Sequence, residues 1–444
     1  MVGVAALAAG TTVLAAPVAH AAPPAGLWAR PLALTARGIV TNGWLDATGT
    51  FRSAGQVGSR VRLTTVAPGG RVTGGGISDD AAATVSLGAG RTLAVTGHDP
   101  VVLTVLDRAG RTLRRFGVRG RLPTLLGFDI RAAAPMPGGG ALVCTDLAGT
   151  RGEELAIVAP AGTGIRRRRI RATARHTAQM APTGGCYGIA PATSGAGAVV
   201  IYENADAATG SGATDAQVML QRVSRRGRLR PPAPVAPPGE TFTVNSGEPQ
   251  VAETSRGWVV VTWLESYRQG PRLLSRQLVR WVAPSGRLGR PVALSRPAAR
   301  IPPAITLAPT GPRSALALVN PEDPDRVIDS VALRPDRRII GRRRRLFTGT
   351  QIVPPAVAGD ERRLTAAWLA ADGVNTATWT RGTWSRPVTV RHCVGYGGAA
   401  VCPVMPAVTA APGGSAAVFY SLVGPNPPRA GGEVVRERAT ASPR

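Results

Sequence analysis

The stretch Glu253–Ser295, ETSRGWVVVTWLESYRQGPRLLSRQLVRWVAPSGRLGRPVALS, decides the fold. A glycine precedes an apolar run from Trp258 to Leu264, and a second apolar run covers Leu278 to Val282. The segment Pro284-Ser285-Gly286 follows as a tight turn before a last short strand that ends at Leu294. Proline and glycine between β-branched runs predict a hairpin. The stretch is therefore predicted to form antiparallel β-structure.

The same pattern returns along the chain. Ala36–Ser78 has RGIVTNGWLD where the first stretch has RGWVVVTWLE, and SRVRLTTVAPGGRV where it has SRQLVRWVAPSGRL. Weaker copies fill the rest, and the last residue of the first strong strand returns at intervals of about 48–61 residues, which suits four short strands per repeat. This column consists of Trp44, Thr96, Cys144, Tyr202, Trp263, Ala317, Trp368 and Tyr420.

The strong strands are apolar at successive positions, as in Trp258–Trp263. A strand has this pattern when both of its faces are buried. Blades packed around an axis bury their strands in this way, so we predict an all-β fold, a β-propeller. Eight column positions predict eight blades of four antiparallel strands, with seven blades as the alternative. The eighth copy lacks its final strand near Arg444, and Ala25–Leu34 resembles that strand, so the chain ends are expected to pair and close the ring.

A family resemblance rests on the repeated motif. A P-x-V-A segment followed by glycine, an apolar strand ending in tryptophan and a hairpin of the form G-x-W/L-x-x-P-V resemble secreted bacterial β-propellers of the sialidase-like kind. The resemblance covers nearly the whole mature chain, as a pattern of the fold. The Asp-box S-x-D-x-G-x-T-W is not intact, and its nearest fragments are Asp46–Phe51 and Arg381–Trp384. The resemblance implies a propeller and assigns no activity.

The first residues predict export. Met1–Ala21 is apolar and uncharged, and it ends in Ala19-His20-Ala21, the pattern of a signal-peptide cleavage site, although the usual positive start is missing. A membrane anchor is the alternative, but Pro17 and His20 interrupt the apolar run. We expect a secreted or cell-surface protein, with one propeller domain over 22–444 and no transmembrane segment.

Four cysteines follow the predicted signal peptide, and an even number in an exported chain suggests disulfides. Cys393 and Cys402 lie close together and flank a glycine-rich stretch, so we pair them, which leaves Cys144 with Cys186. Free buried thiols are the alternative.

The formal net charge is +27, and the sequence contains no lysine, so arginine supplies the positive charge. A soluble arginine-coated surface is one explanation, and electrostatic attachment to acidic polymers or anionic surfaces is the other. The runs Arg166–Arg169 and Arg342–Arg345 fit solvated outer strands, where charge discourages edge pairing, or a polyanion-binding stripe.

Polar side chains follow the column at a constant offset, and a propeller would gather them in a ring around its axis. Such a ring could hold calcium, bind sugar hydroxyls or supply a glycosidic acid/base pair. The competing explanation is that these residues start turns or pair with nearby arginines. No other cofactor is expected. The candidate binding residues are Asp46, His98, Asp146, Asn204, Glu265 and Asn320.

The sequence favours a non-enzymatic role. The chain has no G-x-S-x-G elbow and no H-E-x-x-H motif. We expect a rigid extracellular scaffold that recognises a glycan, an envelope polymer or a protein through its rim loops, and a monomer, because a closed propeller has no edges to bury. The alternative is a sialidase-like glycoside hydrolase or lyase using rim carboxylates such as Asp46, Asp146 and Glu265. A third possibility is attachment through the arginine surface, which moderate salt would reverse.

Overall fold

The structure is a computed structural model, and it describes twenty-four segments of the chain. These are residues 28–29, 31–35, 39–45, 48–57, 60–79, 81–96, 100–108, 110–119, 133–136, 138–146, 153–170, 180–181, 186–191, 197–206, 217–236, 249–299, 305–319, 327–336, 340–348, 355–370, 373–396, 399–411, 415–423 and 431–437. Within them, strands dominate, and a single 3-10 turn, η1, covers Pro160–Gly162. The predicted signal peptide lies outside the described residues.

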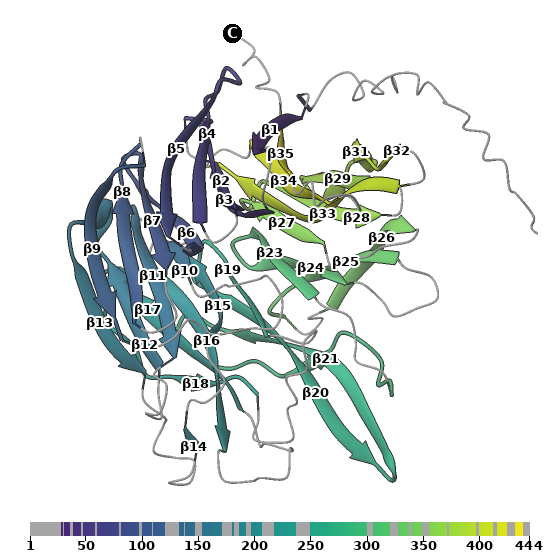
Figure 1. Ribbon diagram of the computed structural model, residues 1–444. Coiled ribbons are helices and arrows are strands. Elements are labelled where there is room, and N and C mark those ends of the chain that lie inside the picture. Colours follow the sequence, from purple (N-terminus) through teal and green to yellow (C-terminus); the bar gives the residue numbers. More distant parts are fainter. Residues whose placement is uncertain are drawn as a thin grey trace, which may run out of the picture.

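The strands form eight antiparallel sheets that are arranged in a ring (Figure 1). Blades 1 to 4 consist of β2 (Ile39–Leu45), β3 (Phe51–Val57), β4 (Arg60–Val66) and β5 (Val72–Asp79); β6 (Ala81–Gly88), β7 (Arg91–Thr96), β8 (Val101–Leu106) and β9 (Thr112–Val118); β10 (Ala133–Met136), β11 (Gly140–Asp146), β12 (Glu153–Val158) and β13 (Ile165–Ile170); and β14 (Met180–Ala181), β15 (Cys186–Pro191), β16 (Gly197–Asp206), β17 (Gln217–Ser224) and β18 (Ala233–Pro234).

Blades 5 to 8 continue in the same order. They consist of β19 (Gln250–Glu253), β20 (Val259–Gln269), β21 (Arg272–Val282) and β22 (Val292–Ala293); β23 (Ile305–Gly311), β24 (Ser314–Val319), β25 (Val327–Leu333) and β26 (Ile340–Thr348); β27 (Ala356–Gly359), β28 (Arg363–Ala370), β29 (Gly373–Thr380), β30 (Thr383–Trp384) and β31 (Val388–His392); and β32 (Val394–Tyr396), β33 (Ala399–Ala410), β34 (Ala416–Val423), β35 (Gly431–Arg436) and β1 (Leu32–Thr35). The prediction of an eight-bladed β-propeller is confirmed.

The first strand of each blade lies innermost, with β15 in this place in blade 4 and β33 in blade 8. These strands contact one another around the ring, β2 against β6, β6 against β10, and so on to β27 against β33 and β33 back against β2. The other strands then follow outwards in chain order, except that β1, from the N-terminus, is the outermost strand of blade 8. The first and third strands of a blade run in one direction and the second and fourth in the other, because every pairing is antiparallel.

The N-terminal strand closes the ring, as the sequence predicted. β1 pairs antiparallel with β35, with Leu32 opposite Val434. Trp28 forms a further bridge with Glu437 and is only 3% exposed, because it packs among side chains of blades 7 and 8. Pairing the two ends of the chain completes blade 8 and ties it to blade 1, whose first strand β2 follows β1 directly in the chain.

The middle strands of each blade carry the core. Val259, Val260 and Val261 on β20 are all fully buried, since the faces of blade 5 pack against blades 4 and 6. Trp263 and Trp281 are both 1% exposed, Trp263 against side chains of blade 4 and Trp281 against side chains of blade 6. The continuous apolar pattern of the sequence therefore marks two-sided burial, and the tryptophans of the repeat are core residues.

A turn ending in Gly-Arg joins the third strand to the fourth in several blades. In blade 5 the backbone N–H of Ala283 donates to the carbonyl of Arg287 over 2.9 Å, and Gly286 has a φ of +90°. The left-handed glycine follows a tight turn and directs the chain into the outer strand. The same backbone hydrogen bond recurs from Ala67 to Arg71, from Asp107 to Arg111 and from Ser224 to Arg228.

Blade 1 departs from the predicted register. Trp44 was aligned with the column that includes Trp263 and Trp368, and those two lie on β20 and β28, the second strands of their blades. Trp44 instead lies on β2, the innermost strand of blade 1, and the second strand is β3. The alignment of the first copy was therefore wrong by one strand. The resemblance of its third strand and turn, Ser59–Val72, to the stretch in blade 5 holds.

Arginine side chains fasten neighbouring blades together. Arg222 on β17 donates to the carbonyls of Gly257 over 2.9 Å and Ala283 over 3.2 Å in blade 5, and Arg436 on β35 donates to Ala67 in blade 1 over 2.8 Å. Contacts of this kind to carbonyl groups of a neighbouring blade also run from Arg91 to Ala161, Arg114 to Thr163, Arg166 to Arg226, Arg168 to Gly227, Arg343 to Leu294 and Arg344 to Gly382. A guanidinium group can donate to several acceptors at once, which an ammonium group on one stem does less well. Part of the positive charge therefore has a structural role.

Candidate functional site

The sequence-predicted ring is only partly described. Asp46, His98 and Asn320 lie outside the described residues, and for Asp146 and Asn204 only the strand position is given, at the ends of β11 and β16. The calcium site and the binding role of these residues therefore stay predictions. Within the described part of the chain, no three His, Cys, Asp or Glu side chains lie together as a metal site would require.

Glu265 is described, and it lies on the long hairpin of β20 and β21 that projects from the ring (Figure 1). Arg276 lies opposite it on the partner strand and donates from Nε to its Oε2 over 2.6 Å. The same guanidinium group stacks over Tyr267 at 5.1 Å from the ring centre. This carboxylate is thus paired with a nearby arginine. Such pairing is the explanation that the sequence offered as the alternative to a ligand-binding role.

Strand direction separates Asp46 from the other candidate residues. Asp46 comes directly after β2, a first strand, in the sequence, whereas Asp146 is the last residue of β11, a second strand. Adjacent strands are antiparallel, so first and second strands end at opposite faces of the propeller. We therefore do not expect Asp46 to share a rim with Asp146, Asn204 and Glu265.

Disulfides are described at two of the four cysteines. Cys144 and Cys393 are both disulfide-bonded, and no described cysteine is a free thiol. The side chains of Cys186 and Cys402 are not described, so the pairing stays a prediction.

A buried tyrosine–carboxylate pair lies between blades 7 and 8. Tyr420 donates its phenolic hydrogen to Glu433 Oε2 over 2.9 Å, and Arg391 Nε lies 3.2 Å from the same oxygen. Burial, reinforced by the negative charge of Glu433, raises the pKa of Tyr420 well above its ordinary value. Sialidases use a tyrosine as the nucleophile, but the Tyr420 side chain is fully buried and stays protonated. These three residues therefore hold two blades together, without access to a dissolved substrate.

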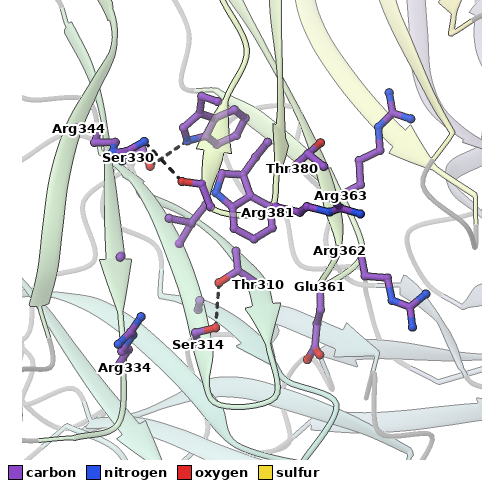
Figure 2. A pocket seen from close by; sticks show the side chains of 16 residues that line it. Thr310, Ser314, Ser330, Arg334, Arg344, Glu361, Arg362, Arg363, Thr380 and Arg381 are labelled. Carbon is purple, nitrogen blue, oxygen red and sulfur yellow. Dashed lines mark hydrogen bonds between the residues drawn. The ribbon is translucent and has the colours of Figure 1, made fainter.

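A concave pocket lies between blades 6 and 7. Its cavity volume is about 900 Å³, within the range of ligand-binding pockets. Strands β24 and β25 form one wall, and β29 with the turn into β30 forms the other (Figure 2). The turn Gly311–Ser314 of blade 6 and the turn Gly359–Arg363 of blade 7 border it. We call it the blade 6–7 groove; it opens at the face where first strands end, opposite the end that carries Glu265.

Positive charge dominates the groove. Figure 2 shows Arg334 and Arg344 on one side of it and Arg362 and Arg363 on the other, with Arg381 on the turn between β29 and β30. Among the described residues, the side chains of Arg334, Arg362 and Arg381 make no hydrogen bond or ion pair. Among described residues, the Arg344 side chain has one hydrogen-bond partner, the carbonyl of Gly382, at 3.5 Å. Four guanidinium groups thus have no carboxylate partner in the described part of the chain.

The two acids near the groove are already engaged. Glu361 accepts hydrogen bonds from the backbone N–H of Ser255 over 2.5 Å and from its hydroxyl over 2.7 Å, which ties blade 7 to a turn of blade 5. Glu437 accepts a hydrogen bond from Arg363 over 2.9 Å. Burial raises the pKa of Glu437, and Arg363 opposes that effect only in part. Neither acid therefore neutralises the other four arginines.

An apolar and aromatic wall completes the groove. Trp379 and Trp384 lie opposite each other on β29 and β30, and Trp379 packs against Leu316. Trp384 is partly exposed, and its indole N–H donates to the hydroxyl of Ser330 over 2.9 Å. A fixed indole beside arginine side chains offers a flat apolar surface next to donors for an anion. Together these groups can hold an anionic ligand that has a flat or ring-shaped apolar face.

Arg381 has an unusual backbone conformation. Its φ is +50°, in the left-handed region, and Gly382 follows with a φ of +89°. Non-glycine residues are uncommon there, and such positions gather at functional sites. A two-residue turn of the same kind joins the first and second strands of blade 2, and it has alanine in this conformation, Ala89 with a φ of +50°, followed by Gly90. The side chain that blade 7 carries here is therefore a long, charged one that lines the groove.

Sequence reasoning missed the groove, although one motif pointed toward it. The fragment Arg381–Trp384 was noted only as a remnant of an Asp-box. An Arg-Gly pair at the tip of a predicted hairpin indicates a left-handed position occupied by a charged side chain. Arg334 and Arg344 lie on the preceding blade, and only the ring places them opposite that turn.

Comparisons with known proteins show no family for this chain. No protein-family model matches the chain, and no curated relative was found. Solved structures similar to it include hydrazine synthase of Kuenenia stuttgartiensis (TM-score 0.48, 14% identity, 76% of this chain and 94% of that chain). The WD40 domain of Toxoplasma gondii coronin has a TM-score of 0.42 and 8% identity over 83% of this chain and 86% of that chain. A prolyl endopeptidase has a TM-score of 0.43 and 11% identity over 88% of this chain and 55% of that chain.

These neighbours are β-propeller proteins of diverse function, so at such low identity they assign none to this chain. They do not support the resemblance to sialidase-like propellers. In the described part of the chain, no helix has the length and apolar composition needed to cross a bilayer.

Proposed function

We propose that the protein is a secreted, non-enzymatic binding propeller that recognises an anionic polymer of the cell envelope or an acidic glycan in the blade 6–7 groove. The predicted signal peptide, Met1–Ala21, and the predicted single domain, 22–444, belong to this proposal. So do the two predicted disulfides: the pairing of Val394 with Val401, continued by one residue, brings the backbone of Cys393 opposite Cys402.

The proposal rests on the positive charge of the groove, which lies next to an indole side chain. Arg334, Arg344, Arg362 and Arg381 line one cavity with Trp384. Like charges so close together repel one another unless a counter-charge is bound, and arginine binds carboxylate and phosphate groups through two parallel hydrogen bonds. A ligand that supplies the missing negative charge therefore fits better than a neutral one.

The groove favours binding over hydrolysis. A glycoside hydrolase of the common type needs a pair of carboxyl groups on either side of the bond that is cleaved. In the groove, Glu361 is the acid that lines the cavity, and both of its oxygens accept hydrogen bonds from Ser255. The arrangement offers donors for an anion and no acid pair among the described lining residues.

Isothermal titration with defined oligosaccharides tests the proposal. The probes are a galacturonate hexamer, which is acidic, and maltohexaose, which is neutral, at about 150 mM salt to screen long-range attraction. We expect the acidic hexamer to bind and the neutral one to bind at least about tenfold more weakly, a difference of about 1.4 kcal/mol. Equal binding of the two would contradict the proposal.

Two double variants with the same change of charge locate the site. Arg334→Gln with Arg362→Gln removes two guanidinium groups of the groove, and we expect about a tenfold loss of affinity for the acidic hexamer. Arg115→Gln with Arg226→Gln removes two exposed arginines from blades 2 and 4 and is expected to change the affinity less than about twofold. If the two variants lose affinity equally, the net charge and not the groove binds the polymer.

A further inference from the structure

A second pocket lies on the other side of the hairpin that borders the groove. Its cavity volume is about 380 Å³, and it lies between blade 7 and the strand end that closes the ring, where Trp28 forms part of its wall. Arg363, Thr380 and Trp384 line both this pocket and the blade 6–7 groove. The two cavities therefore meet along the β29–β30 hairpin. We call the second one the blade 7–8 pocket.

The blade 7–8 pocket has a different chemistry. Five of its lining side chains carry hydroxyl groups: Thr376, Thr378, Thr380, Thr383 and Ser385. Its charged groups are Arg363, which is paired with Glu437 over 2.9 Å, and the exposed Arg386. The groove thus presents several uncompensated charges, whereas the pocket beside it presents a few hydroxyl groups on a mainly apolar wall that includes Trp28 and Trp384, a combination that suits a sugar ring.

The turn that separates the two cavities is rigid. Thr380 and Thr383 lie opposite each other at the tip of the hairpin, and Ser385 accepts a hydrogen bond from the N–H of Thr378 over 3.0 Å while its own N–H donates to the carbonyl of Thr378 over 2.8 Å. Trp384 is held by its hydrogen bond to Ser330. A ligand that passes across this hairpin meets a fixed surface and loses little affinity to reordering of the protein.

From this juxtaposition we infer that the ligand is an acidic polysaccharide chain that spans both cavities. One acidic sugar residue lies in the blade 6–7 groove against the arginines, and a neighbouring sugar residue lies in the blade 7–8 pocket, where hydroxyl side chains exchange hydrogen bonds with its hydroxyl groups. The chain crosses the face of Trp384 between the two. A polyphosphate or a single-stranded nucleic acid satisfies the arginines but offers few hydroxyl groups to the second subsite, so it fits less well. This inference rests on the proposed function of the groove and extends it.

Chain length is the first test. We expect a galacturonate hexamer to bind at least about tenfold more tightly than the dimer, because only the longer chain reaches both cavities. A dimer and hexamer of equal affinity would overturn the two-subsite inference but leave the proposed function of the groove standing. Failure of both to bind would overturn the proposed function itself.

A double variant confined to the second pocket separates length from charge. Thr383→Val with Arg386→Gln removes one hydroxyl and one positive charge from the blade 7–8 pocket. We expect the advantage of the hexamer over the dimer to fall below about threefold, while the affinity for the dimer is unchanged. The matched control is Arg71→Gln with Thr73→Val, the same pair of changes at exposed positions of blade 1, which should keep the full advantage. Loss of the advantage in both variants would overturn the inference.

Ligand class is tested with the same protein. A polyphosphate of about the same charge as the hexamer and a thymidine homopolymer should each bind the wild type more weakly than the hexamer, and the double variant of the second pocket should not change their affinities. Tighter binding of the nucleic acid, with loss of that affinity in the double variant, would assign both cavities to a nucleic acid.

Discussion

Replacing Arg381 with glycine should make the protein more stable and weaken its binding. Arg381 has a φ of +50°. The left-handed region costs a non-glycine residue about 1–2 kcal/mol, which glycine would avoid. Glycine also makes the unfolded chain more flexible, and this offsets about 0.4–1 kcal/mol of the gain in stability. We therefore expect Arg381→Gly to raise the free energy of unfolding by about 0.5–1 kcal/mol. At the same time the groove loses one guanidinium group, and we expect about a tenfold loss of affinity for an acidic hexasaccharide.

Ala89→Gly is the matched control. Ala89 has the same φ of +50° and, like Arg381, precedes a glycine in a two-residue turn. It should gain similar stability with no loss of binding. Urea denaturation gives the change in stability, provided that the dependence on urea stays the same, and isothermal titration gives the affinity. If Arg381→Gly is less stable than the wild type, or binds as tightly, the backbone strain is unrelated to function.

Three further predictions concern closure, pH and disulfides. Trp28→Ala should lower the free energy of unfolding by about 3–5 kcal/mol, because Trp28 is 3% exposed where the two chain ends pair. Leu113→Ala, at a position 45% exposed, should lower it by less than about 0.5 kcal/mol. Equal effects in urea denaturation would rule out a closing role for Trp28. Burial raises the pKa of Glu437 above its ordinary 4.5, so the folded state binds the carboxyl proton more tightly than the unfolded state does. The free energy of unfolding of the wild type, relative to that of Glu437→Gln, should therefore fall as the pH rises from about 4 to 7. A difference that stays constant with pH would contradict this. Peptide mapping without reduction should find Cys393 joined to Cys402, and a link from either one to another cysteine would refute that pairing.

The sequence predicted the fold because burial on two faces leaves a strong pattern. Val259 to Leu264 is apolar at every position but Thr262, and in the structure both faces of β20 are covered by neighbouring blades. The chain-end pairing was predictable as well, because the last copy lacks a strand that the N-terminus supplies. Blade 1 was misaligned because Ile39–Leu45, an innermost strand, happens to resemble the second strand of blade 5.

The groove was not predictable for a physical reason. Its arginines lie on turns and outer strands of two blades, where a charged side chain in the sequence is adequately explained by exposure to water. They come close together only because the ring places blade 6 beside blade 7. Likewise, the arginines that fasten blades together, such as Arg222 and Arg436, look like solvated surface in the sequence. The burial that lowers the pKa of both guanidinium groups arises only from the packing of neighbouring blades.

A crystal structure of the protein with a bound galacturonate hexamer tests the central claim most directly. The account predicts one acidic sugar residue against Arg334, Arg362 and Arg381, with the chain continuing over Trp384 into the blade 7–8 pocket. A hexamer bound instead along the outer strands β9 and β13, or at the end of the propeller that carries Glu265, would contradict it.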